Sequence, residues 1–226
     1  MTLRNWADVY NERAQRFTDP LEICEFYAGQ QTCPPEWFSA VADVIATSLE
    51  LQPHDSVLEV GCGCGVLMRH VLPRAGRFVG IDAAELPLQV ARKDLPEATF
   101  LQAFAESLPF PDGEFDACFC YQVLHLLGDL DIVRQACREI LRVVKPGGRV
   151  LLGQIPDAAK HDEYQAIRRQ RTFQRAPVVQ HDLKWLWFQR EFFEELTPQV
   201  RSLEITTNAL DADPSTHFRF DVRIVV

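Results

Sequence analysis

The chain has 226 residues, of which 47% are hydrophobic and 24% are charged, and its formal net charge is -9 at pH 7. This composition is typical of a folded globular protein, and no apolar run reaches the ~18 residues that a membrane-spanning helix needs. Nucleic acids are bound through basic surfaces, so the acidic balance argues against a phosphate backbone as the main partner. We expect neither a nucleic acid nor a membrane among the partners.

The cysteines and the amino terminus indicate the compartment. Seven cysteines are an odd number, and two pairs of them are separated by a single residue. This is a poor framework for disulfides and fits reduced thiols. The first residues mix charges from the start and contain no apolar core of a secretory signal. We expect a cytoplasmic protein with one domain, monomeric or homodimeric.

Strand-like and helix-like segments alternate along the chain. Residues 35–50 place apolar side chains on one helical face, and the apolar residues 56–60 form a strand that runs into glycines. Strands that alternate with helices predict a parallel sheet covered on both faces, hence an α/β fold. The elements that follow are predicted in chain order as a helix at 65–72, a strand at 77–82, a helix near 84–94, strands near 98–103 and at 115–120, a helix at 129–144 and a strand at 149–154.

Two features mark the end of this alternation. The Lys-Pro-Gly-Gly run at 145–148 is predicted to end the preceding helix and to turn the chain into the next strand, because proline cannot continue a helix and glycine permits a turn. Residues 201–210 and 217–226 are two strand-like segments with no helix between them. They predict an antiparallel hairpin at a sheet edge.

Residues 57–67, with the sequence VLEVGCGCGVL, indicate where a ligand binds. In open α/β sheets ligands lie beyond the carboxyl ends of the strands, and glycines after the first strand let the backbone approach a nucleotide. Asp82 ends the next strand about 20 residues further on, where a carboxylate can accept the hydroxyls of a ribose. The pattern favours a nucleotide site.

The alternative is a metal or thiol-redox site. Cys62 and Cys64 follow the first strand, and Cys118 and Cys120 lie on the strand expected beside it. Structural zinc sites, however, more often use Cys-x2-Cys spacing, and a buried strand often carries cysteine as a small apolar side chain. We predict core packing for these cysteines and no metal.

Four motifs in register carry a family resemblance: LEVGCGCG, VGIDAA, AESLPFPDGEFD and LRVVKPGG. In this order and spacing they resemble the class I S-adenosylmethionine-dependent methyltransferases, particularly the methyltransferase type 11 group, over roughly residues 55–153. The segments WFQREFFEEL and FRFDVRIV are similar to methyltransferases encoded with surface-polysaccharide genes. The resemblance implies a Rossmann-like doubly wound sheet of seven strands, mostly parallel, with a C-terminal antiparallel hairpin.

The resemblance also implies a division of the chain and a set of cofactor residues. A cofactor-binding core at 55–155 is expected between an N-terminal helical cap at 1–50 and a helical insertion or substrate lid at 156–195, with the terminal hairpin at 200–226. The resemblance implies that the glycine loop lines the methionine and ribose part of the cofactor. It also implies that Asp82 binds the ribose hydroxyls and that the backbone of Ala105 meets the adenine edge. The implied cofactor-binding residues are Glu59, Gly61, Cys62, Gly63, Gly65, Asp82, Ala83, Phe104, Ala105, Glu106 and Tyr121.

Phe104 departs from the family pattern, which commonly has aspartate there to accept a hydrogen bond from the adenine amino group. Phenylalanine cannot accept that bond, so the adenine has to be held by stacking, by Gln102 or by backbone alone. The missing charge-assisted bond is worth on the order of 1.5 to 3 kcal/mol. We therefore expect a lower affinity for S-adenosylmethionine, or a site that binds the adenine in another way.

Methyl transfer needs alignment of donor and acceptor more than it needs catalytic side chains. For a hydroxyl acceptor, His125 is the predicted general base, and the alternative is that it packs beside the cofactor. The residues that select the substrate are expected outside the core, and Trp6 and Tyr10 are the first candidates. Further candidates are Arg168, Arg169, Arg171, Arg175, Trp185 and Trp187, for which a solvated helix face with apolar anchors is the alternative.

The expected function is methyl transfer from S-adenosylmethionine, with S-adenosylhomocysteine as product, to a small-molecule or glycan acceptor, in the first place a hydroxyl. Two alternatives stay open. One is a protein that binds S-adenosylmethionine or its product without turnover. The other is an NAD-dependent oxidoreductase, which shares the glycine loop and Asp82 but has a different glycine spacing.

Overall fold

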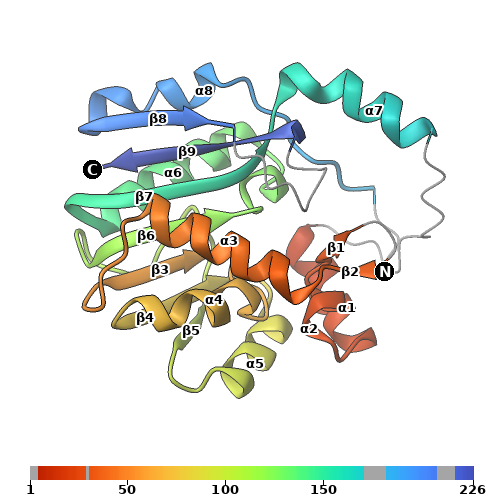
Figure 1. Cartoon of the computed structure of the whole chain (residues 1–226), viewed down its shortest axis with the longest axis horizontal. Coiled ribbons are helices and arrows are strands. Elements are labelled where there is room, and N and C mark those ends of the chain that lie inside the picture. The colour runs from red at the N-terminus through yellow and green to blue at the C-terminus, as the bar shows by residue number, and fades with distance from the viewer. Residues whose placement is uncertain (1–4, 29–30, 171–181, 208–216) are drawn as a thin grey trace.

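A seven-stranded sheet forms the centre of the protein (Figure 1). The computed structural model describes residues 5–28, 31–170, 182–207 and 217–226. The order across the sheet is β5-β4-β3-β6-β7-β9-β8. The first five strands in this order are parallel, and β9 is antiparallel to β7 and β8, so the predicted fold class is confirmed. The bounds are β3 (Ser56–Val60), β4 (Arg77–Asp82), β5 (Thr99–Gln102), β6 (Phe115–Tyr121), β7 (Val144–Pro156), β8 (Ser202–Thr206) and β9 (Arg219–Val225).

Helices cover both faces of the sheet. On one face α3 (Pro35–Ser48), α4 (Val66–Val71) and α5 (Glu85–Asp94) pack in a common apolar core with β3, β4 and β6. On the other face, α6 (Leu130–Val143) and α8 (Glu191–Glu194) pack on the alternate side chains of the same strands. This is the arrangement that the alternating sequence pattern predicts, because successive strand residues point to opposite faces.

Smaller elements lie beyond the ends toward which the parallel strands run (Figure 1). They are α1 (Trp6–Arg16), α2 (Pro20–Ile23) and the short pair β1 (Tyr27–Ala28) and β2 (Gln31–Thr32), while α7 (His161–Gln170) follows β7. The predicted cap at 1–50 thus consists of two different parts. Its α3 belongs to the helix layer on the sheet, and α1 and α2 lie at the strand ends.

The Lys-Pro-Gly-Gly run differs from its prediction. Helix α6 does end before it, at Val143, but the run lies inside β7 rather than in a turn. Val144 already pairs with Phe115 of β6, and the register then shifts. Gly147 adopts a φ of 81°, in the region that favours glycine, and allows the strand to bulge. The strand is therefore longer than the predicted 149–154.

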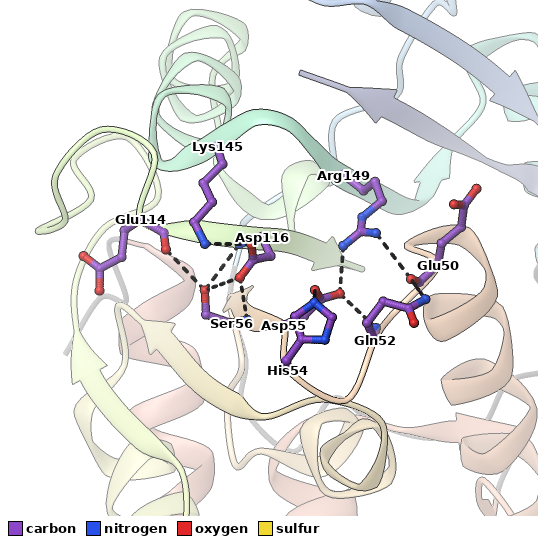
Figure 2. A network of polar contacts seen from close by, with 9 residues as sticks. All are labelled: Glu50, Gln52, His54, Asp55, Ser56, Glu114, Asp116, Lys145 and Arg149. Carbon is purple, nitrogen blue, oxygen red and sulfur yellow. Dashed lines mark hydrogen bonds and ion pairs between the residues drawn. The ribbon is translucent and has the colours of Figure 1, made fainter.

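A polar network fixes the amino ends of the central strands (Figure 2). The backbone N–H of Ser56 donates to Oδ2 of Asp116 at 2.9 Å, and Nζ of Lys145 donates to Oδ1 of the same carboxylate at 2.7 Å. Nearby, Nη2 of Arg149 lies 2.7 Å from Oδ2 of Asp55. Burial opposes ionisation of Asp116, but hydrogen bonds from Lys145 and Ser56 outweigh it and hold its pKa at about 2, below the ordinary 3.8. The network ties β3, β6 and β7 together at the end opposite the loops that follow them.

Within the described ranges, no helix combines the length and the apolar character needed to cross a bilayer.

Candidate functional site

A cavity of about 360 Å³ lies at the carboxyl ends of β3, β4, β5 and β6. All the predicted cofactor residues except Gly65 line it. The elements that carry them are far apart in sequence, and the parallel sheet brings them together because its strands end at one edge. The cavity has the size of a small-molecule site, for which about 300 Å³ is the lower end of the usual range.

Gly61 begins the loop after β3 and has a φ of 79°. A Cβ atom built on it would lie 2.3 Å from Cγ2 of Val123, so any side chain here would overlap the core. Gly65 has a different place from the one predicted. It precedes α4, and a Cβ on it would meet Leu95 at 2.8 Å, away from the cavity. Gly65 therefore serves the packing of the loop and does not line the ligand site.

Asp82 holds the glycine loop from the neighbouring strand. Its Oδ2 accepts the N–H of Gly63 at 2.8 Å, and its Oδ1 accepts the N–H of Ala84 at 2.8 Å. Burial raises the pKa of Asp82, and these backbone hydrogen bonds act against that shift. Each carboxylate oxygen retains further acceptor capacity for hydroxyls of a ligand.

Glu59 lies at the bottom of the cavity with 3% of its surface exposed. Its Oε2 has no hydrogen-bond partner among the described residues. Burial raises the pKa of Glu59 well above its usual value, and the nearby Cys24 and Asp82 raise it further. A buried acceptor without a partner is costly, so this oxygen is suited to a donor or cation that a ligand brings.

Phe104, Ala105 and Glu106 line the cavity after β5. Ala105 is buried, whereas the Phe104 ring is 55% exposed at the mouth. Ile132 is also exposed and lines the same cavity. Gln102, the predicted substitute for the missing aspartate, donates from Nε2 to the carbonyl of Ala83 at 3.0 Å and does not line the cavity. The mouth of the cavity thus presents apolar side chains.

His125 does not line the cavity and is only 4% exposed. Its ring packs edge-on against Trp185 with centroids 4.9 Å apart, and its carbonyl accepts the N–H of Leu186 at 3.0 Å. Burial lowers the pKa of His125 well below its usual value, and the nearby Arg219 lowers it further. The position of the side chain does not support the predicted role as general base. It supports the alternative, packing beside the site.

The four candidate metal ligands do not converge. Cys62 and Cys64 are buried on the face of the sheet that α3 and α4 cover, and Cys118 and Cys120 on the face that α6 covers. The sheet thus separates the two pairs. In the described part of the chain, no group of three or more His, Cys, Asp or Glu is placed to hold a metal ion.

The predicted substrate residues fall into three groups. Trp6 and Tyr10 of α1 line the cavity. Trp185 packs in a cluster with Trp6, and Trp187 contacts Tyr164 of α7. Arg168 and Arg169 belong to α7, but their side chains lie outside the described part of the structure, as do Arg171 and Arg175 entirely.

Sequence reasoning missed several residues of the cavity wall. Asn5 and Ala7 come from the start of α1, and Cys24 and Phe26 from the segment after α2. Gln122 follows β6 and has a φ of 62°, which is unusual for a residue other than glycine. No local pattern marks the four N-terminal positions, since they reach the site only through the way the N-terminal segment packs on the glycine loop.

Comparison with known proteins agrees with this geometry. Residues 58–152 match the sequence model of the family described as "Methyltransferase domain". The uncharacterized methyltransferase YcgJ of Bacillus subtilis is 37% identical over 108 residues, which are 46% of this chain and 42% of that protein. The ubiquinone biosynthesis O-methyltransferase of Dechloromonas aromatica is 34% identical over 134 residues, 56% of this chain and 55% of that protein. The chain spans about half the length of the curated relatives it matches.

Solved structures share the fold. The amino pentose methyltransferase CalS10 from Micromonospora echinaspora, solved with S-adenosylmethionine bound, superposes with a TM-score of 0.67 at 15% identity, covering 93% of this chain and 98% of that one. The chain thus shares its fold with a methyltransferase solved with S-adenosylmethionine bound, and residues 58–152 match the methyltransferase domain of the type 11 group.

Proposed function

We propose that this protein transfers a methyl group from S-adenosylmethionine to a hydroxyl group of a small molecule or glycan. The observation that carries the proposal is the cavity. It gathers Glu59, the glycine loop, Asp82 and the segment 104–106 from three strand ends, in the order of the motifs that resemble the methyltransferase family. When bound there, the cofactor supplies a methyl group activated on a sulfonium.

The residues of the chain then bind and orient the cofactor. Asp82 would accept the two ribose hydroxyls, since both of its oxygens keep acceptor capacity beside the bonds from Gly63 and Ala84. Glu59 would receive the positively charged amino-acid end, which provides the partner that Oε2 lacks. The adenine would lie against Ala105 and under the exposed ring of Phe104.

The acceptor is proposed to enter beside α1. Asn5, Trp6, Ala7 and Tyr10 line this part of the cavity, which offers flat apolar surface and the Asn5 amide. Gln122 presents a neutral amide from a left-handed backbone position, a kind of strain that is common at functional sites. These groups suit an uncharged acceptor, whose hydroxyl the amides can orient.

Two further points concern the acceptor atom and its proton. Oxygen is favoured over nitrogen by the relative that is named as an O-methyltransferase and matches 56% of this chain. His125 is proposed as a positioning residue, because its ring supports Trp185 and its carbonyl holds Leu186. Alignment of the hydroxyl and exclusion of water, rather than proton removal by this imidazole, would then provide most of the rate.

Calorimetric titration with S-adenosylmethionine and S-adenosylhomocysteine tests the cofactor site first. We expect micromolar binding to the wild type and an at least tenfold weaker affinity for Asp82→Ala, from the loss of a charged hydrogen bond. Asp94→Ala is the matched control, because this aspartate pairs with Arg69 on the surface. An unchanged affinity of Asp82→Ala would place the ribose elsewhere.

A screen with methyl-labelled cofactor then compares sugar alcohols, phenols and the corresponding amines as acceptors. Transfer to a hydroxyl supports the full proposal, and transfer to amines alone would overturn the choice of oxygen. Binding of the cofactor without transfer to any acceptor would favour a protein that binds the cofactor without turnover. The His125→Gln variant should keep its rate within about tenfold, whereas a base contributes ~100-fold or more.

A further inference from the structure

A thiol pair lies where the N-terminal segment contacts the glycine loop. Cys24 follows α2 and lines the cavity, and its Sγ accepts the backbone N–H of Cys64 at 3.4 Å. Between them stands Gly63, on which a Cβ atom would lie 2.9 Å from the same sulfur. The absence of a side chain at 63 therefore lets Cys24 approach the loop closely.

The two side chains also contact each other. The thiol of Cys64 hydrogen-bonds to Cys24, and this bond, followed by burial, raises the pKa of Cys64. Cys64 thus contacts the Cys24 side chain through both its backbone N–H and its thiol. Cys62 is directed elsewhere, because its Sγ lies 2.7 Å from the position that a Cβ on Gly80 of β4 would take.

The cysteines differ in their exposure to solvent. All seven lie in the described part of the chain, and Cys24 is the one that is not buried. A thiol that accepts hydrogen bonds and faces an open cavity is accessible to small oxidants, whereas buried thiols are inert. Cys64 is 2% exposed and directly behind it.

We propose that Cys24 and Cys64 are an oxidation site that forms a disulfide with hydrogen peroxide. The Cys24 sulfur attacks one peroxide oxygen, which breaks the O–O bond and leaves a sulfenic acid. The departing hydroxide takes the proton of the Cys24 thiol and leaves as water. The Cys64 sulfur then attacks the sulfenic sulfur and displaces its oxygen, and the Cys64 proton goes to the released oxygen. The two sulfurs lose two electrons to the peroxide, which ends as two waters.

The disulfide would connect α2 to the loop that forms one wall of the cavity. Its sulfur atoms must approach from hydrogen-bond contact to about 2 Å, so that the loop or the end of α2 has to shift. The loop includes Gly63, whose N–H is bonded to Asp82, and Cys24 lies beside Glu59. If the proposed cofactor site is correct, oxidation lowers its affinity for S-adenosylhomocysteine at least fivefold, and bound S-adenosylhomocysteine slows the oxidation.

Mass spectrometry tests the disulfide without any cofactor. The full reduced chain is treated with peroxide, its remaining thiols are alkylated, and the digest is searched for a peptide linking residues 24 and 64. We expect this link, a fall from seven alkylated cysteines to five, and reversal by dithiothreitol. Cys24→Ser and Cys64→Ala should each abolish it, while Cys137→Ser, a change in α6 on the other face of the sheet, should not.

Alkylation of both Cys24 and Cys64 after peroxide treatment would overturn the proposal, as would linkage of either to another cysteine. Equal over-oxidation of Cys24 in the wild type and in Cys64→Ala would also overturn it, because it would show that Cys64 does not resolve the sulfenic acid. If the disulfide forms but S-adenosylhomocysteine gives no protection, the oxidation site stands and the proposed cofactor placement fails.

Discussion

Glu59 occupies a position that suits a ligand but lowers the stability of the unliganded protein. An acid whose pKa is higher in the folded than in the unfolded chain holds its proton more tightly when folded. Its contribution to the free energy of unfolding is therefore complete below the ordinary pKa, near 4.5 for Glu59, and is lost as the pH rises through the raised folded value. At neutral pH this carboxyl destabilises the unliganded fold.

The variant Glu59→Gln should be more stable than the wild type in the absence of ligand. Removing a buried carboxyl whose raised pKa costs stability above pH 4.5 gains about 1 to 3 kcal/mol, or roughly 3 to 8 °C in Tm at pH 8. At pH 4.5 the two proteins should unfold at nearly the same temperature. Thermal unfolding at both pH values measures this, with the exposed Glu97→Gln as control. An equal or lower Tm at pH 8 would contradict the expectation.

Phe104→Asp restores the side chain that the family commonly has at this position. Because the ring is 55% exposed, the free energy of unfolding should change by less than about 0.5 kcal/mol. Affinity for S-adenosylmethionine, measured by calorimetry, should be kept or increased, since a carboxylate can accept the adenine amino group. Leu101→Asp, at an exposed position of β5 outside the cavity, is the control. A tenfold loss in Phe104→Asp would show that the ring itself holds the adenine.

Residues of the cavity wall could be predicted from the sequence where a motif fixes the backbone around them. Asp82 and Glu59 could be predicted because each occupies a strand end of a recognisable βαβ unit. His125 could not be placed in this way. Whether its ring faces the cavity or the protein depends on a single 3-10 turn at Leu124–Leu126, and a rotation of one residue there decides the direction.

Among the elements, α1 depends on one buried arginine. The Nε of Arg13 donates to the carbonyl of Ile23 at 2.8 Å, its Nη1 lies 2.9 Å from Oε1 of Glu25, and its Nη2 donates to the carbonyl of Glu22. These bonds connect α1 to the end of α2. The two helices carry Trp6, Tyr10 and Cys24 to the cavity, so Arg13 supports this wall from behind.

Arg13→Ala should loosen this wall. The loss of several charged hydrogen bonds in a buried place lowers the free energy of unfolding by about 2 to 4 kcal/mol. Urea unfolding measures the loss, and limited proteolysis should cleave first between residues 5 and 25. Arg16→Ala removes an exposed i,i+4 pair with Glu12 on the same helix and should cost less than about 0.5 kcal/mol. Equal stability of the two variants would contradict the proposed support.

Elements with a strong period could be predicted from the sequence, and those defined by tertiary contact could not. Helices α3 and α6 and strands β3, β4, β6 and β9 lie within about two residues of their expected positions, because each buries an apolar face. The Lys-Pro-Gly-Gly run was wrongly predicted as a turn, since pairing of Val144 with Phe115 overrides the local preference. Helix α1 buries only Trp6, Val9 and Arg13, and α2 has four residues, so Arg13 rather than a wide apolar stripe connects them.

The whole molecule places its stabilising polar network and its cavity at opposite ends of the sheet. The network of Figure 2 binds the amino ends of β3, β6 and β7, and the cavity lies at the carboxyl ends. Both carboxylate oxygens of Asp116 in the network have partners, whereas Oε2 of Glu59 in the cavity has none among the described residues. Changes at the amino ends should therefore affect stability without affecting ligand affinity.

Asp116→Asn tests this separation. The pKa of Asp116 is lowered to about 2, so its stabilising effect is present above its ordinary 3.8 and is lost as the pH falls through the folded value. At pH 7 the variant should be about 1 to 2 kcal/mol less stable in urea, and the difference should shrink at pH 3. Cofactor affinity at pH 7 should be unchanged. Asp112→Asn, a more exposed partner of Arg142, is the control and should change the stability less.

The contact between Gly61 and Val123 bears on how chains of this fold are interpreted. Because a side chain at 61 would overlap Val123 and the φ of 79° favours glycine, the folded chain favours this glycine even if no ligand ever binds. A descendant that had lost methyl transfer would still keep it. The glycine is thus a mark of the fold, whereas the carboxylates at 59 and 82, one of which costs the empty protein stability, are the residues that loss of the proposed cofactor site would leave free to change.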